Sequence, residues 1–161
     1  MAINPFDVNW AEEQVEVMHR LRDVAVALTE LNHHLASWMR LSSTDSNALG
    51  QIIWADQAGE PLSPADLGRK IGMTSGATTA LLNRIEAAGH IRRTREHADR
   101  RRVTLRPQPA ARESTRAFLA EAGTEIAGAV LSAHPAELAT VTAFLSRITA
   151  AATAANHRLG S

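Results

Sequence analysis

The segment that decides the fold runs from Leu62 to Arg106 and reads LSPADLGRKIGMTSGATTALLNRIEAAGHIRRTREHADRRRVTLR. It opens with Ser63, Pro64 and Asp66, an order that is typical of a helix start. The hydroxyl caps the helix, the proline fits its first position, and the acid lies in its first turn. The pattern predicts a short helix over residues 64–70.

A second helix is predicted directly after the first. Residues 71–73 form a turn, either Thr74 or Ser75 supplies the next helix cap, and Gly89 ends the helix. Within the expected range of about 75–88, the apolar side chains that face the core are Leu81, Leu82 and Ile85. Two helices joined by such a turn form a helix-turn-helix.

Two short, arginine-rich strands are predicted after the second helix. Residues 91–95 and 102–106 alternate as half-buried strands do, and residues 96–101 form the loop of a β-hairpin between them. The 17 basic and 17 acidic residues of the whole chain cancel, but residues 90–106 hold seven arginines and two acids. This local excess of positive charge predicts a polyanionic partner.

Helices are also predicted on both sides of this segment. Residues 10–41 carry two adjacent apolar rows, a stripe too wide for a helix that lies on water, and residues 45–57 form a second helix. After the hairpin, one helix is expected to include both Phe118 and Val130, and another to begin at Pro135. These helices pack either as a monomeric bundle or, as we favour, against a second copy of the chain.

The start of the second helix of the pair has the side chains that a helix in the major groove of DNA needs. Thr74, Ser75, Gly76, Ala77 and Thr79 are small or polar and none is negative, so the helix can approach base edges and phosphates. The backbone N–H groups of its first turn can also bind a phosphate. The alternative is that these residues only cap a helix.

Arginines supply the remaining contacts in this interpretation. Arg84, further along the same helix, is a candidate phosphate ligand. Arg100, Arg101 and Arg102 cannot all be buried without partners, so at least one points out of the hairpin tip, where a narrow minor groove favours a planar cation. Asp99 is expected to pair with a neighbouring arginine and fix the shape of the tip. The alternative is a charge run that is merely solvated.

Composition and motif searches exclude several other classes of protein. The chain has no cysteine, so disulfides, thiolate metal sites and cysteine redox sensing are excluded. Its seven histidines lack paired ligand spacing, and no catalytic motif is present, so we expect no metal, no cofactor and no enzyme. We expect no secretion signal, and we expect no apolar run to reach the roughly 20 residues of a membrane span. These features predict a soluble, cytoplasmic protein without a membrane partner.

The helix-turn-helix and hairpin resemble a known family. The run from Leu67 to Arg106 is similar to the winged helix-turn-helix core of the MarR (multiple antibiotic resistance) bacterial transcription regulators. The similarity rests on the small residues that begin the second helix, on its exit over residues 85–89, and on a wing motif formed by Asp99 and Arg101. It is strong over about residues 45–110, whereas only the helix order and the length agree outside them.

The resemblance implies a mainly α-helical fold with a small β-hairpin wing, in which a winged helix-turn-helix is flanked by N- and C-terminal dimerisation helices. The expected domains are a dimerisation helix over 1–44, a DNA-binding module over 45–107 and dimerisation helices over 108–161. The implied homodimer is a bacterial repressor that binds a pseudo-palindromic operator in double-stranded DNA. Base contacts would fall on Ser75, Gly76, Ala77 and Thr79, a phosphate contact on Arg84, and the wing-tip contact on Arg101.

Two positions depart from the family pattern. The strand after the wing ends in Leu105-Arg106-Pro107, where the family usually has leucine-threonine, and relatives often have a longer polar residue at the position of Ser75. The base specificity of relatives is therefore not transferable.

The resemblance also implies a small-molecule effector, often aromatic or anionic, that binds between the dimer helices and the DNA-binding module and releases the operator. The candidate pocket residues are His33, His34, Trp38, Met39, Ile53 and Trp54, although a role as ordinary core and interface residues is favoured for each of them. The alternative function is a winged-helix module that acts through protein contacts without sequence-specific DNA binding.

Overall fold

The computed structural model describes residues 9–95 and 103–159, and within these ranges it has seven helices and two strands. In chain order they are α1 Glu12–Met39, α2 Ser43–Gln57, α3 Pro64–Ile71, α4 Ser75–Ala87, β1 Ile91–Thr94, β2 Thr104–Pro107, α5 Pro109–Ala122, α6 Thr124–Ser132 and α7 Pro135–Leu159. The predicted fold class, mainly α-helical with a β-hairpin, is confirmed.

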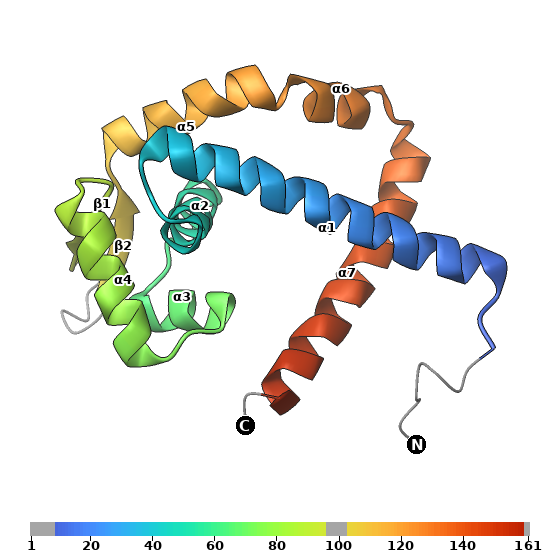
Figure 1. Cartoon of the computed structure of the whole chain (residues 1–161), viewed down its shortest axis with the longest axis horizontal. Helices are drawn as coiled ribbons and strands as arrows, with labels where there is room; N and C mark the ends of the chain where they lie inside the picture. The colour runs from blue at the N-terminus through green and yellow to red at the C-terminus, as the bar shows by residue number, and fades with distance from the viewer. Residues whose placement is uncertain (1–8, 96–102, 160–161) are drawn as a thin grey trace.

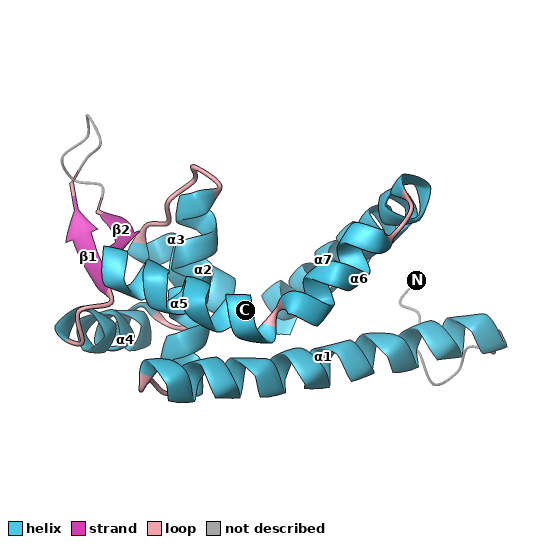
Figure 2. Cartoon of the chain, turned by 90° about the horizontal axis from the view of Figure 1, so that it is seen from above, coloured by secondary structure: helices cyan, strands magenta, loops and turns pink. Residues whose placement is uncertain are grey.

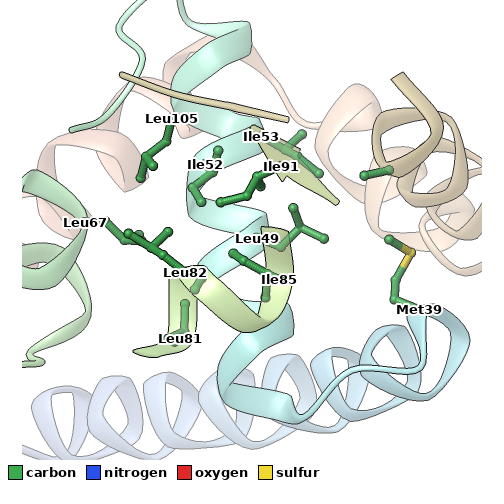
Figure 3. Packing of buried hydrophobic residues seen from close by; sticks show 12 residues of the cluster. Met39, Leu49, Ile52, Ile53, Leu67, Leu81, Leu82, Ile85, Ile91 and Leu105 are labelled. Carbon is green, nitrogen blue, oxygen red and sulfur yellow. The ribbon is translucent and has the colours of Figure 1, made fainter. Parts of the chain in front are cut away.

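The hydrophobic core lies at one end of the molecule, where α2, α3, α4 and the hairpin come together (Figure 1). Figure 3 shows its side chains converging from these elements and from the C-terminal end of α1. Ile52, Leu67, Leu82 and Ile85 are almost completely buried. Burying one such side chain stabilises the fold by about 1.5–3 kcal/mol, so this module has its own core.

The hairpin is antiparallel, with Ile91 opposite Pro107 and Thr94 opposite Thr104. Leu105 donates its N–H to the carbonyl of Leu62, which ties β2 to the segment before α3. The second strand was predicted over 102–106, whereas β2 extends from Thr104 to Pro107. Pro107 is tolerated there because β2 belongs to a two-stranded sheet and is therefore an edge strand.

The chain after the hairpin contains two helices where a single one was predicted through Phe118 and Val130. Gly123 separates α5 from α6 with φ −104° and ψ 0°. A Cβ built on Gly123 would lie 2.6 Å from the carbonyl oxygen of Leu119, so this bend is built around a glycine. Figure 1 shows the resulting arch, in which α5 packs against α1, α6 continues beyond it and α7 turns back.

The helices outside the module leave most of their apolar side chains uncovered. Neither α6 nor α7 contains a buried residue, and α1 buries only Ala36 and Met39. In Figure 2 the N-terminal part of α1 and the pair α6–α7 extend away from the module.

The length and composition of α7 correct one expectation from the sequence. Over the described residues, α7 is the one helix long and apolar enough to cross a membrane by length and composition alone. Core helices of soluble proteins pass the same test. The expectation that no apolar segment reaches this length was therefore wrong.

Candidate nucleic-acid interface

The helix pair α3–α4 is held by the caps that its sequence predicts. The Ser63 hydroxyl accepts a hydrogen bond from the Asp66 N–H at 3.2 Å, and the Asp66 carboxylate accepts one from the Ser63 N–H at 3.1 Å. This reciprocal arrangement is a capping box. Thr74 caps α4, since its hydroxyl accepts a hydrogen bond from the Ala77 N–H at 3.3 Å. The two candidate caps of α4 are thereby resolved in favour of Thr74.

The two helices approach each other closely at Gly68. A Cβ at this position would lie 2.8 Å from the Thr78 hydroxyl oxygen and 3.3 Å from the Met73 carbonyl oxygen. Thr78 is buried, and its hydroxyl donates to the Thr74 carbonyl at 2.9 Å. The contact between Gly68 and Thr78 therefore sets how deeply α4 lies against α3.

The N-terminal turn of α4 presents its small residues outward. Thr74, Ser75, Gly76 and Thr79 are exposed, and Ala77 is half-buried. The first turn of α4 contains no acidic residue. Its N–H groups and the partial positive charge of the helix end therefore meet no negative side chain of that turn, which suits an approaching phosphate. The five predicted contact residues thus lie together on one short surface.

Arg84 is held by an acidic residue of α2. Its Nη2 donates to Asp45 Oδ1 at 2.6 Å and its Nε donates to Asp45 Oδ2 at 3.2 Å. The Asp45 side chain is 8% exposed and that of Arg84 is 56% exposed. The hydrogen bonds and then the charge of Asp45 raise the pKa of Arg84. The predicted phosphate ligand is therefore already occupied by a carboxylate.

Two arginines at the base of the hairpin are also paired with acids. Arg93 Nη1 donates to Glu86 Oε2 at 2.8 Å, and its backbone N–H donates to Glu86 Oε1 at 3.0 Å. Arg106 Nη1 donates to Asp56 Oδ1 at 2.8 Å. Arg92 and Arg95 are exposed. Part of the positive charge read from the sequence is therefore used to attach β1 to α4 and β2 to α2.

The predicted hairpin tip lies outside the described residues. This holds for Arg100, Arg101 and Arg102, the predicted minor-groove contacts, and for Asp99, their predicted stabilising partner. The strands that lead to the tip are described, and they leave the module beside α4 (Figure 2).

Sequence reasoning missed the two buried carboxylates of α2, Asp45 and Asp56. Asp56 is paired with Arg106 of β2 and, at 2.5 Å, with Arg112 of α5, although its own side chain is only 4% exposed. Both acids lie far along the chain from their arginines, so local patterns could not pair them. The available signal was an acid on the core-facing side of an amphipathic helix, which must find a partner.

The six candidate pocket residues do not surround one cavity. Met39 and Ile53 are core residues, while Trp38 and Trp54 are 49% and 65% exposed. An open depression of about 390 Å³ lies along α1, and His33 is the one candidate among its lining residues. His34 is exposed on the same helix.

Trp38 has a structural role in this chain. Its ring packs edge-on against Phe118 with the centroids 6.0 Å apart, and its Nε1 donates to the Ser114 hydroxyl at 3.1 Å. It therefore joins α1 to α5. Throughout residues 9–95 and 103–159, no cluster of three or more His, Asp or Glu side chains is placed to hold a metal ion.

Comparison with known proteins identifies the module. Residues 46–102 match the sequence profile of the MarR family. The HTH-type transcriptional regulator YcgE of Bacillus subtilis is 40% identical over 53 residues, which are 33% of this chain and 34% of that protein. The match therefore spans about a third of the relative's length. This family and this relative are transcription regulators rather than enzymes.

Two solved structures share the fold over most of the chain. A MarR protein from Peptoclostridium difficile is 16% identical with a TM-score of 0.63, and the match covers 99% of this chain and 97% of that one. Staphylococcus aureus MepR in its DNA-binding conformation is 16% identical with a TM-score of 0.67, covering 84% and 97%. The fold similarity thus extends to the flanking helices. The predicted resemblance to the MarR family is confirmed over residues 46–102, which match the profile of that family, and the solved structures extend the similarity of fold to most of the chain.

Proposed function

We propose that the chain is a homodimeric, sequence-specific DNA-binding transcription regulator that acts as a ligand-responsive repressor in the cytoplasm. The observation that carries this proposal is the exposed N-terminal turn of α4. Within a MarR-family module, it displays only small or polar side chains beside an arginine-rich hairpin. Such a helix end fits the major groove, and the hairpin reaches the neighbouring minor groove.

The apolar surface of the flanking helices supports a homodimer. Val24 and Leu28 of α1 are each more than 50% exposed, as are Val130 and Leu131 of α6, and Val141 of α7 is 46% exposed. Exposed apolar surface of this extent is typical of an interface. A second copy offers the same surface, so a two-fold symmetric pairing buries both.

The two modules of such a dimer would bind a pseudo-palindromic operator. Each α4 would contact base edges through residues 74–79, with half-sites about 34 Å apart, one turn of the double helix. Arg101 would enter the minor groove, and Arg100 and Arg102 are further candidate DNA contacts. Discrimination between DNA sequences would then come from α4, since phosphate contacts carry no sequence information.

A small aromatic or anionic effector would release the operator if it bound more tightly to a dimer whose modules are wrongly spaced for the operator than to the DNA-binding form. The residues proposed to contact it remain His33, His34, Trp38 and Trp54, on the surfaces of α1 and α2. Met39 and Ile53 would act from the core behind them, and no bound cofactor is proposed.

Selection of bound sites from random double-stranded DNA with the full chain tests the function. We expect a two-fold symmetric motif with half-sites about one helical turn apart. Enrichment of no motif would refute sequence-specific regulation.

The salt dependence of binding separates this function from a protein-interaction module. Affinity for the selected site should fall steeply between about 50 and 200 mM salt, because each neutralised phosphate releases counterions. A module that acts through protein contacts would show little such dependence on salt.

A further inference from the structure

We propose that Arg84 is a positioning residue, which fixes α4 on α2 through Asp45, and that it does not bind a DNA phosphate. This inference rests on the proposed DNA-binding function. An acidic residue would ordinarily oppose the binding of DNA, which is a polyanion. In this proposal Asp45 instead favours binding, because it holds Arg84 and α4 in place.

The geometry of the pair favours a fixed contact. Both nitrogens Nε and Nη2 of Arg84 face both carboxylate oxygens of Asp45, at 3.2 and 2.6 Å. A planar guanidinium holds a carboxylate in one orientation through such a two-point contact. Asp45 is itself fixed, because its N–H donates to the Ser42 hydroxyl at 3.1 Å at the start of α2.

Burial makes the pair costly to open. The Asp45 carboxylate is 8% exposed, so release of Arg84 to a phosphate would leave a buried charge without its partner. The loss of the partner of a buried carboxylate is destabilising, and the solvent around Arg84, which is 56% exposed, reduces this cost without removing it. A phosphate in solvent would have to compensate this loss before it contributed any affinity.

The Arg84–Asp45 pair lies close to residues 74–79, the proposed DNA-contact surface of α4. Arg84 follows Thr79 by five residues, so the pair lies about 7.5 Å along α4 from the exposed turn. The same end of α4 is attached to β1 through Glu86 and Arg93. The contact with α2 is one of the attachments that fix the rotation of α4 about its axis. Its loss would allow a small rotation, which turns residues 74–79 away from the base edges.

The two roles of Arg84 predict opposite effects of Asp45→Asn. This substitution removes one negative charge beside DNA, so simple electrostatics predicts tighter binding. If Asp45 positions α4, its loss weakens binding instead. Arg84→Lys adds a second distinction, since lysine retains the charge that a phosphate needs but cannot form the two-point contact.

The experiment is a double-mutant cycle on the full chain, with affinity for the selected operator measured over a series of salt concentrations. We expect Asp45→Asn, Arg84→Gln and Arg84→Lys each to weaken binding about tenfold, and the Asp45→Asn/Arg84→Gln double variant to be no weaker than the worse single variant. The salt slope should be unchanged. The matched control is Arg116→Gln, which breaks the exposed Arg116–Glu113 pair of α5 and should leave affinity unchanged.

Three results would overturn the proposal. They are tighter binding by Asp45→Asn, full affinity of Arg84→Lys, and a salt slope that falls by about one in Arg84→Gln, which is the mark of a lost phosphate contact. Hydrogen exchange of the amides at residues 75–79, measured without DNA, tests the positioning even if the wild-type chain binds no operator. We expect faster exchange in all three single variants, and unchanged exchange would contradict the proposal.

Discussion

Single atoms decide how α3 and α4 fit together, and Gly68 is the clearest case. Gly68→Ala places a Cβ 2.8 Å from the Thr78 hydroxyl oxygen, so the two helices must separate. We expect a loss of about 1–3 kcal/mol in the free energy of unfolding, the usual cost of overpacking. Chemical denaturation measures it. The matched control is Gly50→Ala in α2, where the added Cβ meets nothing within 4 Å and should stabilise the helix by up to about 1 kcal/mol. Equal effects of the two substitutions would contradict this account.

His90 links stability to pH at the junction between α4 and the hairpin. Burial lowers the pKa of His90 below its ordinary value of 6.5. As the pH falls through 6.5, His90 binds a proton in the unfolded chain but not yet in the folded chain. Protonation of His90 therefore lowers the free energy of unfolding below pH 6.5 and leaves it unchanged above that pH. His90→Gln should therefore reduce the fall in Tm between pH 7.5 and 5.5. Identical slopes in the two proteins would contradict this linkage.

At the scale of elements, Asp56 joins three of them. It lies on α2 and pairs with Arg106 of β2 and Arg112 of α5, so it fixes the hairpin relative to the helix that leads to the C-terminal region. Asp56→Asn leaves two guanidinium groups without their carboxylate, and we expect about 2 kcal/mol lower stability, less than for a fully buried pair because both arginines are partly exposed. The control Glu113→Gln breaks an exposed pair and should leave the stability nearly unchanged. A smaller loss in Asp56→Asn than in the control would refute the role.

The elements themselves were predictable where their signals are local. Ser63 and Pro64 start α3, and Thr74 starts α4, because caps act over three or four residues. The division at Gly123 was missed, since apolar residues continue on both sides of it and only the backbone geometry shows the bend. The pairs of α2 were missed for a different reason. Their partners come together only through tertiary packing. For the same reason the sequence predicted Arg84 as a DNA contact, whereas the structure pairs it with Asp45.

At the scale of the whole molecule, the open question is what covers the apolar surface of α7. It buries no residue in one chain, while Leu138, Val141 and Leu145 are 36–46% exposed along it. A second copy would cover this row, and so would a lipid bilayer, given the length and composition of the helix. The two possibilities differ in how the purified chain behaves in water.

Light scattering on the full chain in detergent-free buffer is expected to give twice the 17.4 kDa of one chain. Deletion of residues 136–161 removes α7 and should give monomers or insoluble protein, because the apolar faces of α1 and α6 then lose their cover. A well-behaved dimer after this deletion would contradict an interface that uses α7. A full chain that stays in solution only with detergent would assign α7 to a membrane instead, and the two modules would then have no shared helix to set their spacing on an operator.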